Sequence, residues 1–301
     1  MSKTRMARRS KTMCWIEAMR LRTLPVSLAG VAFAAGICVT CHAVNVAVLL
    51  LCALFATLAQ IASNFANEYY DFRDGLDKAG REGPRRGVTE GDITPGAMKR
   101  ATFLTLGLAG VVGVVMVALW GEPWMYAAGI GIALGAMAYS AGPWPLSRHG
   151  LGELAVVGFF GVVPVTLTCL LCGVPWGAWL LWTSVGVGML GANVLIVNNY
   201  RDREEDLAVG KRTLAVILGL RSTGSLYVAF GFMAVLLTMP AWMATIRGAW
   251  IAPCCYLVLH LTLYHQLVTR KGRALNPVLG KTAMLMLVFS LTFLTLSIIG
   301  Q

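Results

Sequence analysis

The chain has 301 residues, of which 57% are hydrophobic and only 13% are charged, and its mean hydropathy is +0.70. Soluble domains carry about 25% charged residues, so this composition leaves too little polar surface for a soluble fold of this length. The net charge of +11 does not indicate nucleic-acid binding, because the cations lie between apolar runs and accompany no readout element. The sequence therefore predicts an all-α, polytopic membrane protein.

Nine apolar segments are close to the roughly 20 residues that a helix needs to cross a bilayer. We predict nine transmembrane helices in a single domain, 1–301, at 24–42, 46–66, 101–119, 123–141, 153–173, 176–198, 223–243, 249–268 and 282–300.

The positive charges give an independent prediction of topology. If the basic tail 1–22 is cytoplasmic, 24 of the 25 Lys and Arg residues fall on the cytoplasmic side and Arg247 alone lies outside. This asymmetry predicts an inner-membrane protein with its N-terminus in the cytoplasm and its C-terminus outside. The two long cytoplasmic loops, 67–100 and 199–222, are then expected to cap the bundle. The eight cysteines fall mostly in apolar segments and are interpreted as small hydrophobic residues.

Two acidic stretches lie at the cytoplasmic edge of apolar segments. The first acidic island, 67–77, and the second, 198–206, hold 8 of the 14 Asp and Glu residues of the chain. Carboxylates are expensive near hydrocarbon, so such clusters indicate a functional site. In the first island Asn67 and Asp71 are four residues apart, and so are Asp202 and Asp206 in the second, so each pair shares one face of a helix.

The oxygen ligands of both islands suit Mg²⁺, which usually binds protein carboxylates together with substrate phosphates. The expected metal ligands are Asn67, Asp71, Asp74, Asp77, Asp202 and Asp206. Cations in the adjoining loops would bind the phosphates.

These residues also carry a family resemblance. The spacings Asn67-x3-Asp71-x5-Asp77 and Asp202-x3-Asp206 resemble the two aspartate-rich motifs of the UbiA superfamily of intramembrane aromatic prenyltransferases. Most members have an aspartate where this chain has Gly75; an aspartate two residues later, as here, is typical of the branch that prenylates 1,4-dihydroxy-2-naphthoate. Stretches 15–25, 139–153 and 198–215 resemble signatures of the same branch.

The resemblance implies a helical bundle around a central cavity, in which two Mg²⁺ ions hold a polyprenyl diphosphate. The implied reaction transfers the polyprenyl group to 1,4-dihydroxy-2-naphthoate with loss of CO₂, giving demethylmenaquinol. Catalysis is then assigned to Asp71, Asp77, Asp202, Asp206 and Lys211. Substrate binding is assigned to Arg20, Arg22, Asn64, Arg85, Arg86, Tyr139, Asn198 and Lys211. Glu153, at the start of an apolar segment, is open to a functional role or to a stabilising one at a helix N-terminus.

Three alternatives remain open at this point. Either Asp74 or Asp77 completes the first metal site. The aromatic acceptor could be 4-hydroxybenzoate or another ring, and a more distant alternative is an ion-coupled transporter, although transporters place ionisable groups near the midplane. The expected partners are the two substrates and the lipid bilayer, with no obligate protein partner evident from the sequence.

Overall fold

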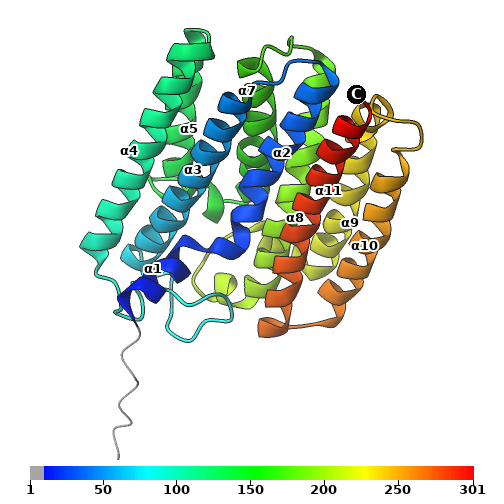
Figure 1. Cartoon of the computed structure of the whole chain (residues 1–301). Coiled ribbons are helices and arrows are strands. Elements are labelled where there is room, and N and C mark those ends of the chain that lie inside the picture. The colour runs from blue at the N-terminus through cyan, green and yellow to red at the C-terminus, as the bar shows by residue number, and fades with distance from the viewer. Residues whose placement is uncertain (1–9) are drawn as a thin grey trace, which may run out of the picture.

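A computed structural model describes residues 10–301, and within that range the chain forms helices and no strand. The first nine residues of the expected basic tail lie outside the described residues. The helices assemble into one bundle of roughly parallel and antiparallel elements (Figure 1). Their bounds are α1 (Lys11–Met19), α2 (Leu24–Thr40), α3 (Val46–Arg73), α4 (Pro95–Trp120), α5 (Trp124–Ser140), α6 (Gly152–Val157), the π-helical segment η3 (Gly158–Val162), α7 (Val163–Leu171), α8 (Ala178–Ala208), α9 (Leu214–Met243), α10 (Ile251–Thr269) and α11 (Asn276–Ile299), with short 3₁₀ turns η1 (Leu21–Thr23), η2 (Leu146–Arg148) and η4 (Gly272–Leu275).

Eight helical stretches in the described part of the chain are long and apolar enough to cross a membrane. Every segment predicted as a span coincides with a helix, so the multi-pass α-helical fold is confirmed. Helix α5 is not among these eight stretches: its 17 residues extend about 26 Å at about 1.5 Å per residue, short of the hydrocarbon thickness of about 30 Å, whereas α2, equally long, continues from α1 and η1 in one stretch, Lys11–Thr40. A ninth span at α5 therefore stays a prediction.

The first acidic island begins on α3, which continues past its apolar part as far as Arg73. Gly75 ends the helix with a φ of +70°, a left-handed conformation that glycine adopts readily. The chain then crosses the end of the bundle as an irregular segment, 74–94, before Thr94 caps α4 by accepting a hydrogen bond from the Ala97 amide. This segment is the part of the expected 67–100 loop that is not helical.

The second expected loop, 199–222, is mostly helix. Helix α8 runs to Ala208, and α9 begins at Leu214, so only 209–213 connects them. Arginine and glutamate are good helix formers, and they extend α8 beyond its apolar part. The turn comes at Gly210, where φ is +76°. The second acidic island therefore lies on a rigid helix.

Close packing holds the helices together, as expected where lipid provides no hydrophobic drive between them. In the core, Phe33 of α2 stacks on Phe293 of α11 with ring centroids 4.1 Å apart. The segment η3 approaches α8 backbone to backbone, because a Cβ on Gly161 would lie 2.3 Å from the Cα of Gly188. The cysteines at 38, 41, 52, 169, 172, 254 and 255 are free thiols.

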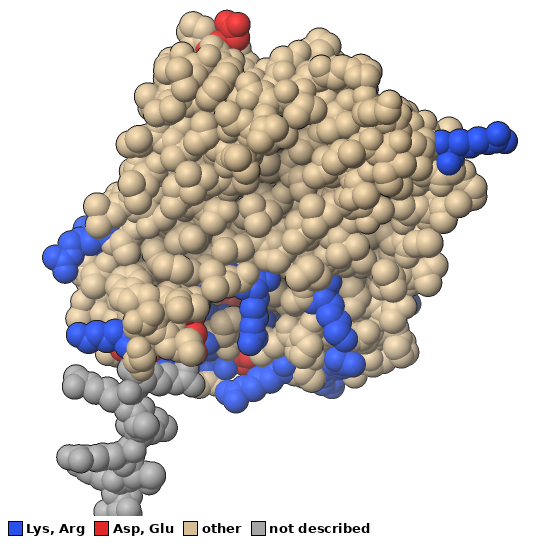
Figure 2. Space-filling model, viewed as in Figure 1, with Lys and Arg blue, Asp and Glu red and all other residues tan. Residues whose placement is uncertain are grey.

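Charge is distributed unevenly between the two ends of the bundle. Lys and Arg side chains gather at the end that carries α1, whereas the opposite end is nearly free of them (Figure 2). The C-terminus lies at the end opposite α1 (Figure 1). The positive-inside rule assigns the basic end to the cytoplasm, and this orientation stays a prediction.

Candidate active site

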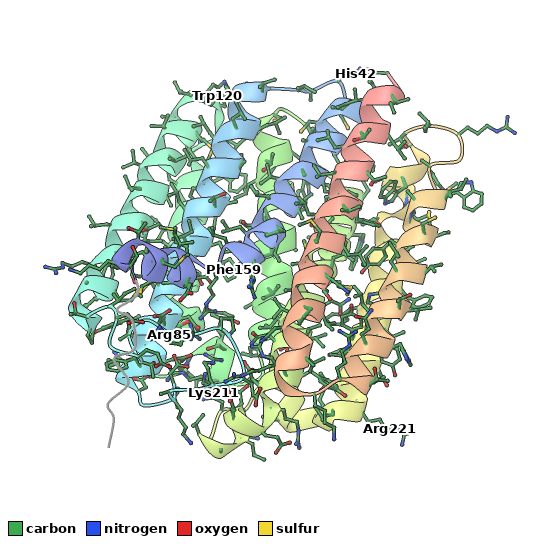
Figure 3. All side chains as sticks on the ribbon, turned by 60° about the horizontal axis from the view of Figure 1, so that its bottom comes forward. His42, Arg85, Trp120, Phe159, Lys211 and Arg221 are labelled. Carbon is green, nitrogen blue, oxygen red and sulfur yellow. The ribbon has the colours of Figure 1, made fainter. Side chains whose placement is uncertain are left out.

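A cavity of about 980 Å³ opens at the basic end of the bundle and brings the two acidic islands together. Most of the residues assigned from the sequence line it. They are Arg20, Arg22, Asn64, Asn67, Asp71, Arg85, Arg86, Tyr139, Asn198, Asp202, Asp206 and Lys211. Arg85 and Lys211 lie at this end in Figure 3, with Phe159 deeper in the bundle.

Asp71 is the most heavily paired carboxylate of the first island, and only 1% of its surface is exposed. Its Oδ2 lies 3.0 Å from the Nζ of Lys211, and its Oδ1 lies 3.3 Å from a guanidinium nitrogen of Arg148. Arg86 approaches the same carboxylate at 3.8 Å. Lys211 comes from the turn after α8, so this pair joins the first island to the second.

Arg81 forms a second link between the two acidic islands. Its Nη1 lies 3.0 Å from Oδ1 of Asp77, and its Nη2 lies 3.0 Å from Oδ2 of Asp202. Arg86 also reaches Asp77, with its Nε 3.2 Å from Oδ2. Burial raises the pKa of Asp77, and the charge of Arg81 acts in the opposite direction.

Asp74 lies in a different environment, although it is only three residues from Asp77. It follows the last residue of α3, and its side chain is 26% exposed. Hydrogen bonding to Arg73 and then to Arg148 lowers the pKa of Asp74. Neither Asp74 nor Asp77 lines the cavity, but Asp77 contacts two arginines that do, Arg81 and Arg86. Asp77 is therefore the better placed of the two to act in the cavity.

Asn67 is held by two arginines. Its Oδ1 accepts hydrogen bonds from Arg20 at 2.9 Å and from Arg86 at 2.8 Å. Arg20 has a φ of +54°, unusual for a residue with a side chain, and this conformation allows the chain to turn between α1 and η1. Asn64, one turn before Asn67, donates to the carbonyl oxygen of Met19 and so fixes the same turn. In the structure, Asn64 therefore positions the C-terminal end of α1.

On α8, Asp202 and Asp206 are one turn apart in the cavity wall. Asp202 accepts from Nε of Arg201 at 2.6 Å, and Arg201 also donates to Oδ1 of Asn198. Asp206 accepts a long hydrogen bond of 3.5 Å from Thr213, and Lys211 lies 4.0 Å away. Among the other assigned residues, Arg85 is paired with Asp92 at 2.7 Å, whereas Arg22 and Tyr139 contribute to the cavity wall.

Sequence reasoning missed three arginines that contact the islands. Arg81 follows Asp77 by four residues, Arg148 is the single cation of the segment between α5 and α6, and Arg201 precedes Asp202 directly. From the sequence alone, each of these arginines serves only as a positive charge in the topology prediction. Their proximity to aspartates in sequence was a usable signal for Arg81 and Arg201, but the pairing of Arg148 with Asp71 depends on the fold.

In residues 10–301, no group of three or more His, Cys, Asp or Glu side chains is close enough together to hold a metal ion. The carboxylates face guanidinium and ammonium groups instead. The donor set nevertheless fits Mg²⁺, because it consists of hard oxygen atoms and because Arg81 already bridges Asp77 and Asp202 with positive charge. A divalent ion between the islands would have to replace such contacts.

The rest of the cavity is mostly apolar and extends deep into the bundle. Asp71 and Cys52 both line it and lie 19 residues apart on α3, which corresponds to about 28 Å along the helix. Phe55, Met116 and Leu171 are among the apolar residues of the deep part. A charged mouth above a long apolar interior suits an amphiphilic ligand with an anionic head.

The fold and the cavity together define a class of protein: an integral membrane protein with an internal cavity suited to such a ligand. The chain belongs to the UbiA prenyltransferase family, whose model matches residues 23–296.

Relatives with established names cover nearly the whole chain. It is 31% identical to a 1,4-dihydroxy-2-naphthoate octaprenyltransferase of Haemophilus influenzae over 94% of this chain and 95% of the relative. It is 36% identical to the protein of the same name from Mycobacterium tuberculosis, over 95% of this chain and 97% of the relative. The fold also matches that of a UbiA homolog from Archaeoglobus fulgidus, solved bound to GPP and Mg²⁺. The TM-score is 0.68 at 16% identity, over 94% of this chain and 99% of that one.

Proposed function

We propose that this chain transfers a polyprenyl group from a polyprenyl diphosphate to 1,4-dihydroxy-2-naphthoate, with loss of CO₂, to give demethylmenaquinol. The observation that carries the proposal is the cavity, in which both acidic islands and their cations form one end and mostly apolar side chains form the rest. The shared name of the bacterial relatives supports the choice of acceptor.

In this reaction the diphosphate lies at the mouth and the prenyl tail lies in the apolar part of the cavity. Lys211, Arg81 and Arg148 would exchange aspartate oxygens for diphosphate oxygens, since charge-assisted hydrogen bonds are strong with either partner. They stabilise the negative charge that develops as the allylic C–O bond breaks. The apolar walls keep water from the resulting cation.

Mg²⁺, most simply as two ions, would be held by Asp71, Asp77, Asp202 and Asp206, with Asn67 as a further oxygen donor. When bound, it supplies Lewis-acid neutralisation of the diphosphate. Asp74, the remaining aspartate of the first island, would position Arg148 through their ion pair. The mouth faces the cytoplasm of an inner-membrane protein whose C-terminus lies outside.

The decisive experiment is an assay of the purified protein in lipid vesicles with a polyprenyl diphosphate and either 1,4-dihydroxy-2-naphthoate or 4-hydroxybenzoate. We expect prenylated product and stoichiometric CO₂ with the naphthoate, and no activity after removal of Mg²⁺ by a chelator. Prenylation of 4-hydroxybenzoate alone would reassign the acceptor. Prenylation of neither ring, together with ion-driven uptake that Asp71→Ala alters, would support a transporter.

A further inference from the structure

Glu153 is a buried acid that the proposed function does not use. It occupies the first turn of α6, and only 2% of its surface is exposed. It nevertheless lies in the wall of the cavity, beside Gly152 and Val156. An ionisable side chain inside a membrane protein is costly unless it serves a purpose, so its surroundings are informative.

One oxygen of the Glu153 carboxylate is held, and the other is free. Asn199 of α8 donates its Nδ2–H to Oε1 at 2.8 Å. The second oxygen, Oε2, has no hydrogen-bond partner among residues 10–301. Buried polar atoms nearly always have a partner, so a free carboxylate oxygen in a cavity wall indicates that a ligand supplies the donor.

Glu153 lies at the depth where an aromatic acceptor must be placed. Its partner Asn199 precedes Asp202 by three residues, which is about 4.5 Å along α8 towards the membrane interior. The adjacent Asn198 contacts Asp202 and Arg201 at the mouth. The acceptor ring has to meet the carbon bonded to the diphosphate, which is just below the mouth.

Tyr139 supports the same placement, because it lies beside the start of α6. A Cβ on Gly152 would lie 3.8 Å from the Tyr139 hydroxyl, so this hydroxyl and the start of α6 are neighbours in the cavity wall. A planar ring that packs beside Tyr139 would therefore also lie close to Glu153.

The fold holds the Glu153 carboxylate in this position. Helix α6 continues into η3, and π-helical segments of this kind are frequent at functional sites. The backbone contact of Gly161 with Gly188 presses η3 against α8, which also carries Asn199. Helix α6 thus approaches α8 closely enough for the Glu153–Asn199 hydrogen bond to form.

We propose that Glu153 is the catalytic base for the aromatic acceptor, a role that rests on the proposed function. Its Oε2 accepts the proton of the ring hydroxyl adjacent to the carboxyl-bearing carbon. That carbon then forms its bond to the prenyl C1 while the C1–O bond to diphosphate breaks, and the hydroxyl carbon becomes a ketone. The β-keto carboxylate loses CO₂, the electrons of that C–C bond restore the aromatic ring, and Glu153 returns its proton to the oxygen.

The test compares Glu153→Gln with Glu68→Gln on a series of dihydroxynaphthoates whose ring hydroxyls differ in acidity. Glutamine at 153 can still accept the Asn199 hydrogen bond through its Oε1, so the fold is retained. Glu68 is a matched control because it is 1% exposed, accepts a hydrogen bond from the Val88 amide, has an unpaired Oε2 and does not line the cavity.

For Glu153→Gln we expect kcat to fall by about 10²- to 10⁴-fold, the usual contribution of general acid–base catalysis. The loss should shrink steadily as the acceptor hydroxyl becomes more acidic, because such acceptors lose the proton without help. Any effect of Glu68→Gln should be the same for all acceptors.

A loss at Glu153→Gln that is equal for all acceptors, or no loss, would overturn the proposal. If the glutamine variant does not fold, Glu153→Asp provides the same comparison, since it keeps the carboxylate and moves it back by one methylene. Failure of the wild-type protein to prenylate any acceptor would instead reject the proposed function. The two failures are therefore distinguishable.

Discussion

At the scale of single residues, the mouth of the cavity consists of carboxylates that are each paired with a cation. Asp71 contacts Lys211 and Arg148, while Arg81 joins Asp77 to Asp202. Such pairs keep charged groups satisfied near hydrocarbon, where an unpaired charge would be expensive. They also hold the cations where an anionic head group would bind.

The different surroundings of Asp74 and Asp77 predict which of them contributes more to the proposed reaction. We expect Asp77→Asn to lower kcat/KM by roughly 100-fold or more and to raise the Mg²⁺ concentration needed for half-maximal rate, because losing a charged ligand in a buried site costs about 3 kcal/mol or more. Asp74→Asn should have less than about a tenfold effect, since exposed ion pairs contribute about 0–1 kcal/mol. Initial rates over a range of Mg²⁺ concentrations distinguish the two.

A larger loss for Asp74→Asn than for Asp77→Asn would reverse the assignment. Asp92→Asn provides a control, because Asp92 pairs with Arg85 and lies outside both acidic islands.

At the scale of helices, the site depends on the close approach of η3 to α8. The approach needs glycine at two facing positions, Gly161 and Gly188, and it brings Glu153 within reach of Asn199. A side chain at this contact would change both the stability of the protein and its rate of prenyl transfer.

The variant Gly161→Ala tests this contact. Its Cβ would lie 2.3 Å from Gly188, so the helices must separate, and overpacking of this kind costs about 1–3 kcal/mol. We expect a lower midpoint of thermal unfolding in detergent and a reduced rate of prenyl transfer. Gly158→Ala in the same π-helical segment is the matched control, because nothing lies within 4 Å of its added Cβ. Equal unfolding midpoints for the two variants would show that the contact tolerates a methyl group.

The helices themselves were largely predictable, since every expected apolar segment forms one. The end of α8 was less predictable: the spacing of Asp202 and Asp206 indicates a helix, but the same stretch belongs to the expected loop 199–222, and in the structure the helix continues through Glu204 and Glu205 to Ala208. The cavity residues of the two islands followed from their spacing. The partners of those residues did not, because Arg148 and Asp71 are 77 positions apart and meet only through the packing of α3 against α5 and of α5 against η2.

At the scale of the whole molecule, the uneven charge of the two ends predicts the orientation in the membrane. The basic end carries the cavity mouth, and the C-terminus lies at the other end. An odd number of crossings places the two ends of the chain on opposite sides of the membrane, as the topology prediction requires.

Reporter fusions check this orientation in cells. Alkaline phosphatase fused after Gln301 should be active, because the enzyme works only outside the cytoplasm, and a fluorescent protein at the same position should be dark. Fused after Arg273, between α10 and α11, the two reporters should behave in the opposite way. Fluorescence after Gln301 would show that the orientation or the number of spans is wrong.

The pairing of the carboxylates at the mouth with cations also bears on how the protein is assembled in the membrane. Because the mouth is electrically balanced by its own side chains, α3 and α8 can dock during membrane insertion without a metal ion to screen their aspartates. In proteins whose metal site forms part of the fold, binding and folding are a single event. If Mg²⁺ binds as proposed, it would bind an already assembled mouth, and we expect a cell short of Mg²⁺ to accumulate the assembled protein all the same.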